Sequence, residues 1–159
     1  MSGNVVVHPA PAWRDRANFL IAARINHNEP DAEWQWEQLW VRQLSRNLFE
    51  VCCIPFFVYG ICLGDYVTAE IDSEKRYVLG QCVRASGHFS FRIWFKDEQT
   101  RLEICHELKM LGCETEQRWE GSRLLAVDAE SESLAQRVAD LLHEKEQSGA
   151  LCYETARLS

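Results

Sequence analysis

The clearest alternation of apolar and polar positions lies in the second half of the chain. From residue 89 to residue 95, Phe and Ile side chains occupy every second position, as in a strand with one face in a core. After a polar start at residues 97–100, apolar residues recur at helical spacing up to Leu111. Gly112 stands where a left-handed C-terminal cap is expected. The pattern therefore predicts a strand followed by a helix.

The same half continues with two strands, a second helix and a last strand. Residues 113–119 and 123–128 are predicted strands joined by a hairpin turn. A second helix begins near Ser131 or Ser133 and ends before Gly149, and a final strand follows. The order strand, helix, strand, strand, helix, strand is that of the ferredoxin-like βαββαβ unit.

The first half contains strand patterns and no convincing helix. The predicted strands are residues 16–25, 33–44, 49–54, 65–71 and 77–84, separated by short turn signals. Five short strands favour a small bent β-sheet or barrel. The predicted fold class is therefore α+β, with a β-rich subdomain at residues 1–87 closely packed against a ferredoxin-like α+β subdomain at residues 88–159.

A charge-free run from Val51 to Gly64 is the densest apolar segment. It is shorter than the roughly 20 residues that a membrane-spanning helix needs, and Pro55 and Gly60 interrupt a helix. We expect a buried strand, a crossover at Pro55 and a turn into Asp65. On the strand before it, Trp34, Trp36 and Trp40 share one face, which we expect to belong to the core.

Composition narrows the classes of function. The chain has 159 residues, of which 47% are hydrophobic and 26% charged, as in a soluble globular protein. A formal net charge of -7 argues against a nucleic-acid partner, because phosphate binding needs clustered Lys and Arg, but it suits a basic protein partner. The sequence has neither a secretory signal pattern nor a membrane span, so a cytoplasmic location is expected.

Cysteine and histidine spacing does not point to a metal centre or a disulfide framework. The seven cysteines are an odd number without a CxxC pair, and the five histidines show no HxxxH spacing. Reduced thiols, no metal and no cofactor are the expectation. Ser86-Gly87-His88 has two interpretations: a Ser and a His framing an anion or a nucleophile, or a bend between the halves with Gly87 at a positive φ angle.

Acidic residues are concentrated in the second half. Residues 1–87 carry ten acids against eight Lys and Arg, a net of -2, whereas residues 88–159 carry fourteen against nine, a net of -5. This excess is either an ordinary solvated face or a docking surface that captures a basic partner. Trp119 is a candidate anchor, because interface hot spots favour Trp. The predicted partner-binding residues are Glu114, Glu116, Trp119, Glu120, Asp128, Glu130 and Glu132.

Several segments together resemble a bacterial family of domains of unknown function. They are WRDRANF at residues 13–19, EQLWVRQL at 37–44, residues 49–67 with IPFF and GD, residues 84–95 with SGH, and LKMLG at 108–112. Related small cytoplasmic proteins are often immunity partners of secreted bacterial toxins, and the resemblance implies such a role. It supplies no catalytic residues, and IPFF, GD and SGH are interpreted as fold determinants.

The leading hypothesis is a non-enzymatic immunity protein that neutralises a cognate toxin, such as a nuclease, by covering its active site. The alternative is a regulatory domain that binds a small ligand or a housekeeping enzyme. An enzyme is the third hypothesis, with Cys62, Asp65 and His88 as the residues to test.

Overall fold

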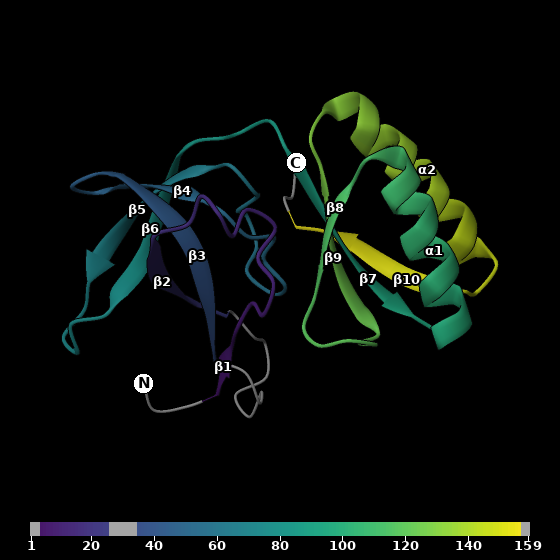
Figure 1. Ribbon diagram of the computed structural model, residues 1–159, viewed down its shortest axis with the longest axis horizontal. Coiled ribbons are helices and arrows are strands. Elements are labelled where there is room, and N and C mark those ends of the chain that lie inside the picture. The colour runs from purple at the N-terminus through teal and green to yellow at the C-terminus, as the bar shows by residue number, and fades with distance from the viewer. Residues whose placement is uncertain (1–3, 26–34, 157–159) are drawn as a thin grey trace.

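The computed structural model describes residues 4–25 and 35–156. The fold is α+β, with two β-sheets and, among the described residues, two helices (Figure 1). The two sheets lie side by side, and both helices lie on the side of the second sheet that faces away from the first (Figure 1). Within the described residues, neither helix combines the length and the apolar character needed to cross a lipid bilayer.

The first sheet contains the five predicted strands and a short additional one. Its strands are β1 (Val5–Val6), β2 (Phe19–Arg24), β3 (Trp36–Ser45), β4 (Leu48–Val51), β5 (Tyr66–Ile71) and β6 (Tyr77–Arg84). Their order is β1-β3-β2-β6-β5-β4, and β4 also pairs with β3. Strands β2 to β6 therefore form a closed ring of pairings, and the two-residue β1 lies outside this ring.

Strand β3 shows which face of the sheet is the core. Leu39 and Val41 are fully buried and belong to the core cluster, and Glu37 shares their face because side chains alternate along a strand. Trp36 and Trp40 lie on the opposite face, where guanidinium groups of arginines stack on their rings. Trp36 is nevertheless buried, at 5% exposure, and Trp40 packs partly buried against the core cluster, as expected of core residues, while Trp34 lies outside the described residues.

The charge-free run is buried but is not a strand. Only Val51 belongs to β4, and residues 52–65 have no regular secondary structure. Ile54, Phe56 and Leu63 are fully buried in a cluster that also includes Leu124 and Ala126 of the second half. The prediction of a strand up to Ile54 is wrong, and the run is instead a buried loop between the sheets. Such a loop needs internal partners for its peptide groups.

The second sheet follows the predicted order of elements. They are β7 (Phe89–Phe95), α1 (Glu98–Leu111), β8 (Glu114–Gln117), β9 (Leu124–Ala129), α2 (Glu132–Gln147) and β10 (Leu151–Thr155). The strands are antiparallel in the order β10-β7-β9-β8. Gly112 ends α1 at φ 94°, as predicted, and Ser131 rather than Ser133 caps α2 by accepting a hydrogen bond from the Leu134 amide.

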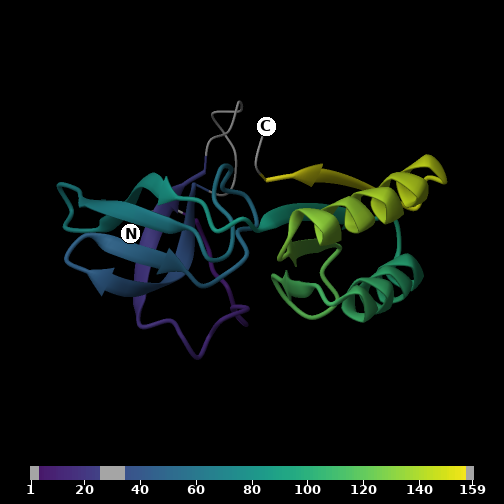
Figure 2. The same ribbon diagram turned by 90° about the horizontal axis from the view of Figure 1, so that it is seen from above.

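The two faces of the second sheet pack against different parts of the molecule. Phe91, Ile93 and Phe95 pack with the apolar stripes of α1 and α2. Leu124 and Ala126 of β9 join the core of the first half. Both helices lie on the other side of this sheet, away from the first half (Figure 2). The two halves therefore share one apolar cluster, and this shared contact positions the polar groups described next.

Candidate functional site

The predicted partner-binding residues do not form one exposed surface. They belong to the β8–β9 hairpin and to the start of α2, and they separate into two groups. Glu114 and Asp128 are paired residues at one end of the hairpin, whereas Trp119 and Glu120 lie in the turn at its other end. Glu114, Trp119, Glu120, Glu130 and Glu132 are exposed, but Glu116 and Asp128 are buried.

Glu116 lies in the contact between the halves. It is only 3% exposed, because its side chain points from β8 towards the buried loop. Its carboxylate accepts hydrogen bonds from the backbone amides of Ala12 and Ile54 and contacts the His8 ring at 2.7 Å. The prediction that Glu116 belongs to an exposed acidic surface is wrong, because the first half covers this part of β8 and its amides bind the Glu116 carboxylate.

Asp128 is also withdrawn from solvent. Both of its carboxylate oxygens lie 2.9–3.0 Å from Nδ1 of His88. Burial raises the pKa of the Asp128 carboxyl, and the hydrogen bond to Asp128 raises the pKa of the His88 imidazole. Asp128 therefore orients His88, and its place on the exposed acidic surface is a second correction.

Trp119 is exposed, as the predicted role of an anchor requires. Its side chain is 57% exposed, which is far above what a core tryptophan shows. The guanidinium of Arg118 lies 4.9 Å from the Trp119 ring and 5.4 Å from the Phe57 ring. This stacking orients an exposed aromatic side chain beside the buried loop.

A buried ionic triad forms the centre of the contact between the halves. His8 bridges two carboxylates, with Nε2 at 2.7 Å from Glu37 and Nδ1 at 2.7 Å from Glu116. Its ring stacks on Phe56, with ring centres 4.4 Å apart. Glu37 also accepts hydrogen bonds from the successive amides of residues 56, 57 and 58. The triad thus supplies hydrogen-bond acceptors for four amides of the buried loop.

The triad carries charge in the folded protein. Burial alone would lower the pKa of His8, but the neighbouring Cys53 and the two carboxylates outweigh it and raise the pKa well above its ordinary value. Burial alone would raise the pKa of Glu37, but hydrogen bonds from His8 and from the loop amides outweigh it and lower the pKa. In the resulting state, a protonated His8 ring lies between the carboxylates of Glu37 and Glu116, which also accept hydrogen bonds from backbone amides.

The triad is placed for structure rather than for nucleophilic chemistry. Cys53 adjoins His8, but it is fully buried, and burial raises the pKa of its thiol. Burial likewise raises the pKa of Cys52 to about 12. A reactive cysteine needs an exposed, lowered-pKa thiol. In the described part of the chain, no group of three or more His, Cys, Asp and Glu is arranged to hold a metal ion.

The Ser86-Gly87-His88 segment forms the bend between the halves. Gly87 has φ 88°, as the bend interpretation predicts. The Ser86 hydroxyl donates to the Leu63 carbonyl at 2.7 Å and accepts from the His88 amide at 3.1 Å. Asp65 is buried and accepts from the Ser86 amide at 2.8 Å. Because His88 contacts Ser86 only through its backbone, the pair is not a Ser–His nucleophile.

A cavity of about 190 Å³ opens beside this bend. Its walls include Trp13, Glu50, Tyr66, Arg84, Ser86 and His88. The Trp13 ring meets the His88 ring edge-on, with centres 5.8 Å apart. We call this cavity the junction pocket. Of the three residues of the enzyme hypothesis, His88 lines this pocket, whereas Cys62 and Asp65 are fully buried and do not.

Comparison with known families places most of the chain in one of them. Residues 37–153 match the model of a domain of unknown function, DUF4265. The chain belongs to the DUF4265 family. The predicted resemblance to a family of unknown function is thereby confirmed, while the IPFF, GD and SGH pattern and the immunity role stay predictions. No curated protein matches the chain.

One solved structure resembles this DUF4265 protein in fold. It is described as a novel crystal structure of a hypothetical protein from Neisseria gonorrhoeae, with a TM-score of 0.72. The match covers 89% of this chain and 97% of that chain at 18% sequence identity. At that identity the similarity bears on the fold alone.

Sequence reasoning missed the triad of this DUF4265 protein. Glu37 and Glu116 fall inside the family match, and His8 precedes it. One signal was present in the sequence, because Glu37 shares strand parity with Leu39 and Val41 and so occupies a core-facing position. Nothing in the spacing of residues 8, 37 and 116 indicated that they meet.

Proposed function

We propose that this protein is a non-enzymatic binding protein, an immunity protein that neutralises a cognate toxin by occluding its active site. The observation that carries the proposal is the exposed Trp119, stacked on Arg118 beside exposed Glu120 at the hairpin turn. An ordered, exposed tryptophan in mixed-charge surroundings is the kind of residue that contributes most to protein–protein binding.

The electrostatic part of the proposal rests on the surface acids. Glu114, Glu130 and Glu132 remain exposed at the other end of the β8–β9 hairpin. Acidic side chains at the rim of an interface speed the capture of a basic partner more than they strengthen the final complex. A nuclease toxin presents a basic surface to its substrate, so we propose a nuclease as the partner. Nucleic acid itself is not a proposed partner.

The proposed role fits a cytoplasmic protein without metal or cofactor. We also assign the first sheet to a small barrel and residues 88–159 to a ferredoxin-like unit. The return of β4 to β3 supports the barrel. The strand order β10-β7-β9-β8, with a helix after the first and after the third strand in sequence, supports the ferredoxin-like unit.

The test is co-expression with a toxin gene adjacent to the gene for this protein. Rescue of growth and a stable complex on gel filtration are expected. Trp119→Ala should weaken the complex by about tenfold or more, as truncation of a hot-spot residue does. Met110→Ala is the matched control, because Met110 is an exposed apolar residue, 74% exposed, on α1. Absence of rescue, or equal weakening by both variants, would contradict the proposal.

Removal of the exposed acidic residues should slow the capture of the partner. Glu114→Gln combined with Glu130→Gln should lower the association rate and its salt dependence while leaving the dissociation rate nearly unchanged. Glu70→Gln removes an exposed acid from β5 in the first half and serves as the control. The alternative function, a regulatory domain for a small ligand, is favoured by a different observation, the junction pocket.

A further inference from the structure

The junction pocket has walls whose polar groups are held in place from behind. Asp128 fixes the His88 ring through contacts at 2.9 and 3.0 Å, and Asp128 is only 2% exposed. Ser86 is fixed by the Leu63 carbonyl and by the buried Asp65. A site whose contacting side chains are already oriented loses less conformational entropy when a ligand binds. The polar side chains of the pocket are therefore pre-oriented, as they are in binding sites.

The acceptor groups of the pocket are largely occupied by the protein itself. Arg16 donates to both carboxylate oxygens of Glu50, at 2.7 and 2.8 Å, and Arg42 donates to one of them at 3.1 Å. A carboxylate has about four lone-pair positions, so Glu50 keeps little capacity for a ligand. The Ser86 hydroxyl likewise donates to one backbone group and accepts from another.

The hydrogen-bonding capacity that remains is donor capacity. His88 uses Nδ1 for Asp128, which leaves Nε2 on the opposite side of the ring. The hydrogen bond to Asp128 raises the pKa of His88 and so favours the imidazolium, in which Nε2 carries a proton. Arg84 lies with its guanidinium over the Tyr66 ring at 5.5 Å, and no hydrogen bond of this group is seen among the described residues. Its five N–H donors remain available.

We propose that the junction pocket binds a small free oxyanion, through a carboxylate or phosphate group that accepts hydrogen bonds from His88 and Arg84. The volume of about 190 Å³ limits the ligand to a small molecule. Trp13 and Tyr66 form aromatic walls beside the donors. The hydrogen bond to Asp128 and the nearby acids Glu130 and Asp65 favour the protonated form of His88 by raising its pKa.

NMR titration of the full chain tests this inference. Sodium phosphate and sodium acetate are added in separate arms, against sodium chloride at equal ionic strength, while the ring signals of His88 and the side-chain signal of Arg84 are followed. Saturable shifts of both residues are expected in at least one oxyanion arm and not with chloride. The arm with the tighter binding identifies the phosphate or the carboxylate as the preferred group.

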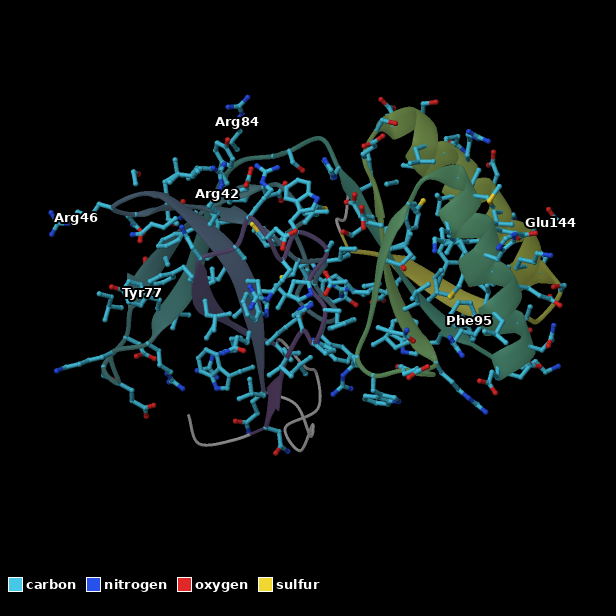
Figure 3. The ribbon with its side chains drawn as sticks, in the orientation of Figure 1. Arg42, Arg46, Tyr77, Arg84, Phe95 and Glu144 are labelled. Atoms are coloured by element: carbon cyan, nitrogen blue, oxygen red, sulfur yellow. The ribbon has the colours of Figure 1, made fainter. Side chains whose placement is uncertain are left out.

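Two arginine variants decide whether the binding is local. Arg84→Gln should weaken oxyanion binding at least tenfold, whereas Arg46→Gln should leave it within twofold. Both remove one exposed positive charge from the first half, but Arg84, at the end of β6, lines the junction pocket, whereas Arg46 lies in the turn between β3 and β4 at the far end of the molecule (Figure 3). Linear shifts without saturation in both arms, or equal weakening by the two variants, would overturn the inference. Because no toxin is used, this result is independent of the immunity proposal.

Discussion

His8 and Glu116, 108 positions apart in the sequence, meet at 2.7 Å in the interior and join the two halves of the molecule. Glu37, on the other side of the His8 ring, completes the bridge to β3. Both carboxylates also bind amides of the charge-free loop. The triad therefore connects the N-terminal segment, both sheets and the buried loop, and its loss should affect the whole fold rather than one element.

Glu116→Gln should lower the free energy of unfolding by about 3–5 kcal/mol, because it removes one partner of a buried charged group. The NH₂ group of the amide would face either the Ala12 and Ile54 donors at Oε2 or the His8 ring at Oε1, so one donor would meet another. Urea unfolding monitored by tryptophan fluorescence measures the loss.

Glu114→Gln is the matched control for this experiment. Glu114 lies two residues away on the same strand but is exposed, so its replacement should change stability by no more than about 0.5 kcal/mol. Similar losses for the two variants would show that Glu116 has no special structural role.

His8→Gln should destabilise the protein in a pH-dependent way. The pKa of His8 is raised in the folded state, so its contribution is full below its unfolded value of about 6.5 and is lost as pH rises through the folded value. The pKa of Glu37 is lowered, so its contribution is lost only in acid. The stability gap between wild type and variant should therefore be largest near pH 5–6.5 and should narrow on the alkaline side.

Urea unfolding of both proteins at a series of pH values from 5 to 10 measures this gap. A magnitude of about 3–5 kcal/mol is expected near pH 6, since both carboxylates lose their buried cation. A gap that stays constant across this range, or widens with pH, would mean that His8 is neutral in the folded protein.

The regular elements could be predicted from the sequence because their signals are local. The strand at residues 89–95 and the Gly112 cap follow from side-chain alternation and from the conformational freedom of glycine. The buried loop could not be predicted in this way. Its run of apolar residues predicts a buried strand, whereas four of its amides are satisfied by the distant carboxylates of Glu37 and Glu116, whose positions depend on the tertiary fold.

The docking residues show the same limit. That Glu116 and Asp128 carry negative charge is evident from the sequence, but their burial depends on which face of the β8–β9 hairpin meets the first half. That contact is tertiary and brings together residues far apart in the chain. Exposure of Trp119, at the hairpin turn, was predictable because turns lie on the surface.

Asp128→Asn should lower the pKa of His88. The hydrogen bond to Asp128 is the main cause of the raised value, and an amide offers no negative charge to the imidazolium. NMR titration of the His88 ring in wild type and variant measures the change. Because the pKa of His88 is raised on folding, its contribution is full below about pH 6.5 as long as Asp128 is ionised, and it is lost as pH rises through the folded value of His88.

Glu132→Gln provides the comparison for this variant. Glu132 is an exposed acid in the first turn of α2 that makes no hydrogen bond to His88. Its replacement should leave the titration of His88 nearly unchanged. An unchanged His88 pKa in Asp128→Asn would instead show that the contact at 2.9–3.0 Å does not hold the imidazolium.

Gly64→Ala should destabilise the fold more than Gly121→Ala. Both glycines have positive φ angles, 85° and 84°, so each alanine incurs the left-handed backbone cost of about 1–2 kcal/mol. At Gly64 the added Cβ would also lie 3.0 Å from the Ser86 Cβ and 3.2 Å from the Trp13 ring, whereas nothing lies within 4 Å at Gly121. Crowding of the junction should add about 1–3 kcal/mol. Thermal or urea unfolding of the two variants measures the difference, and equal losses would show that the bend at Ser86 yields freely to a methyl group.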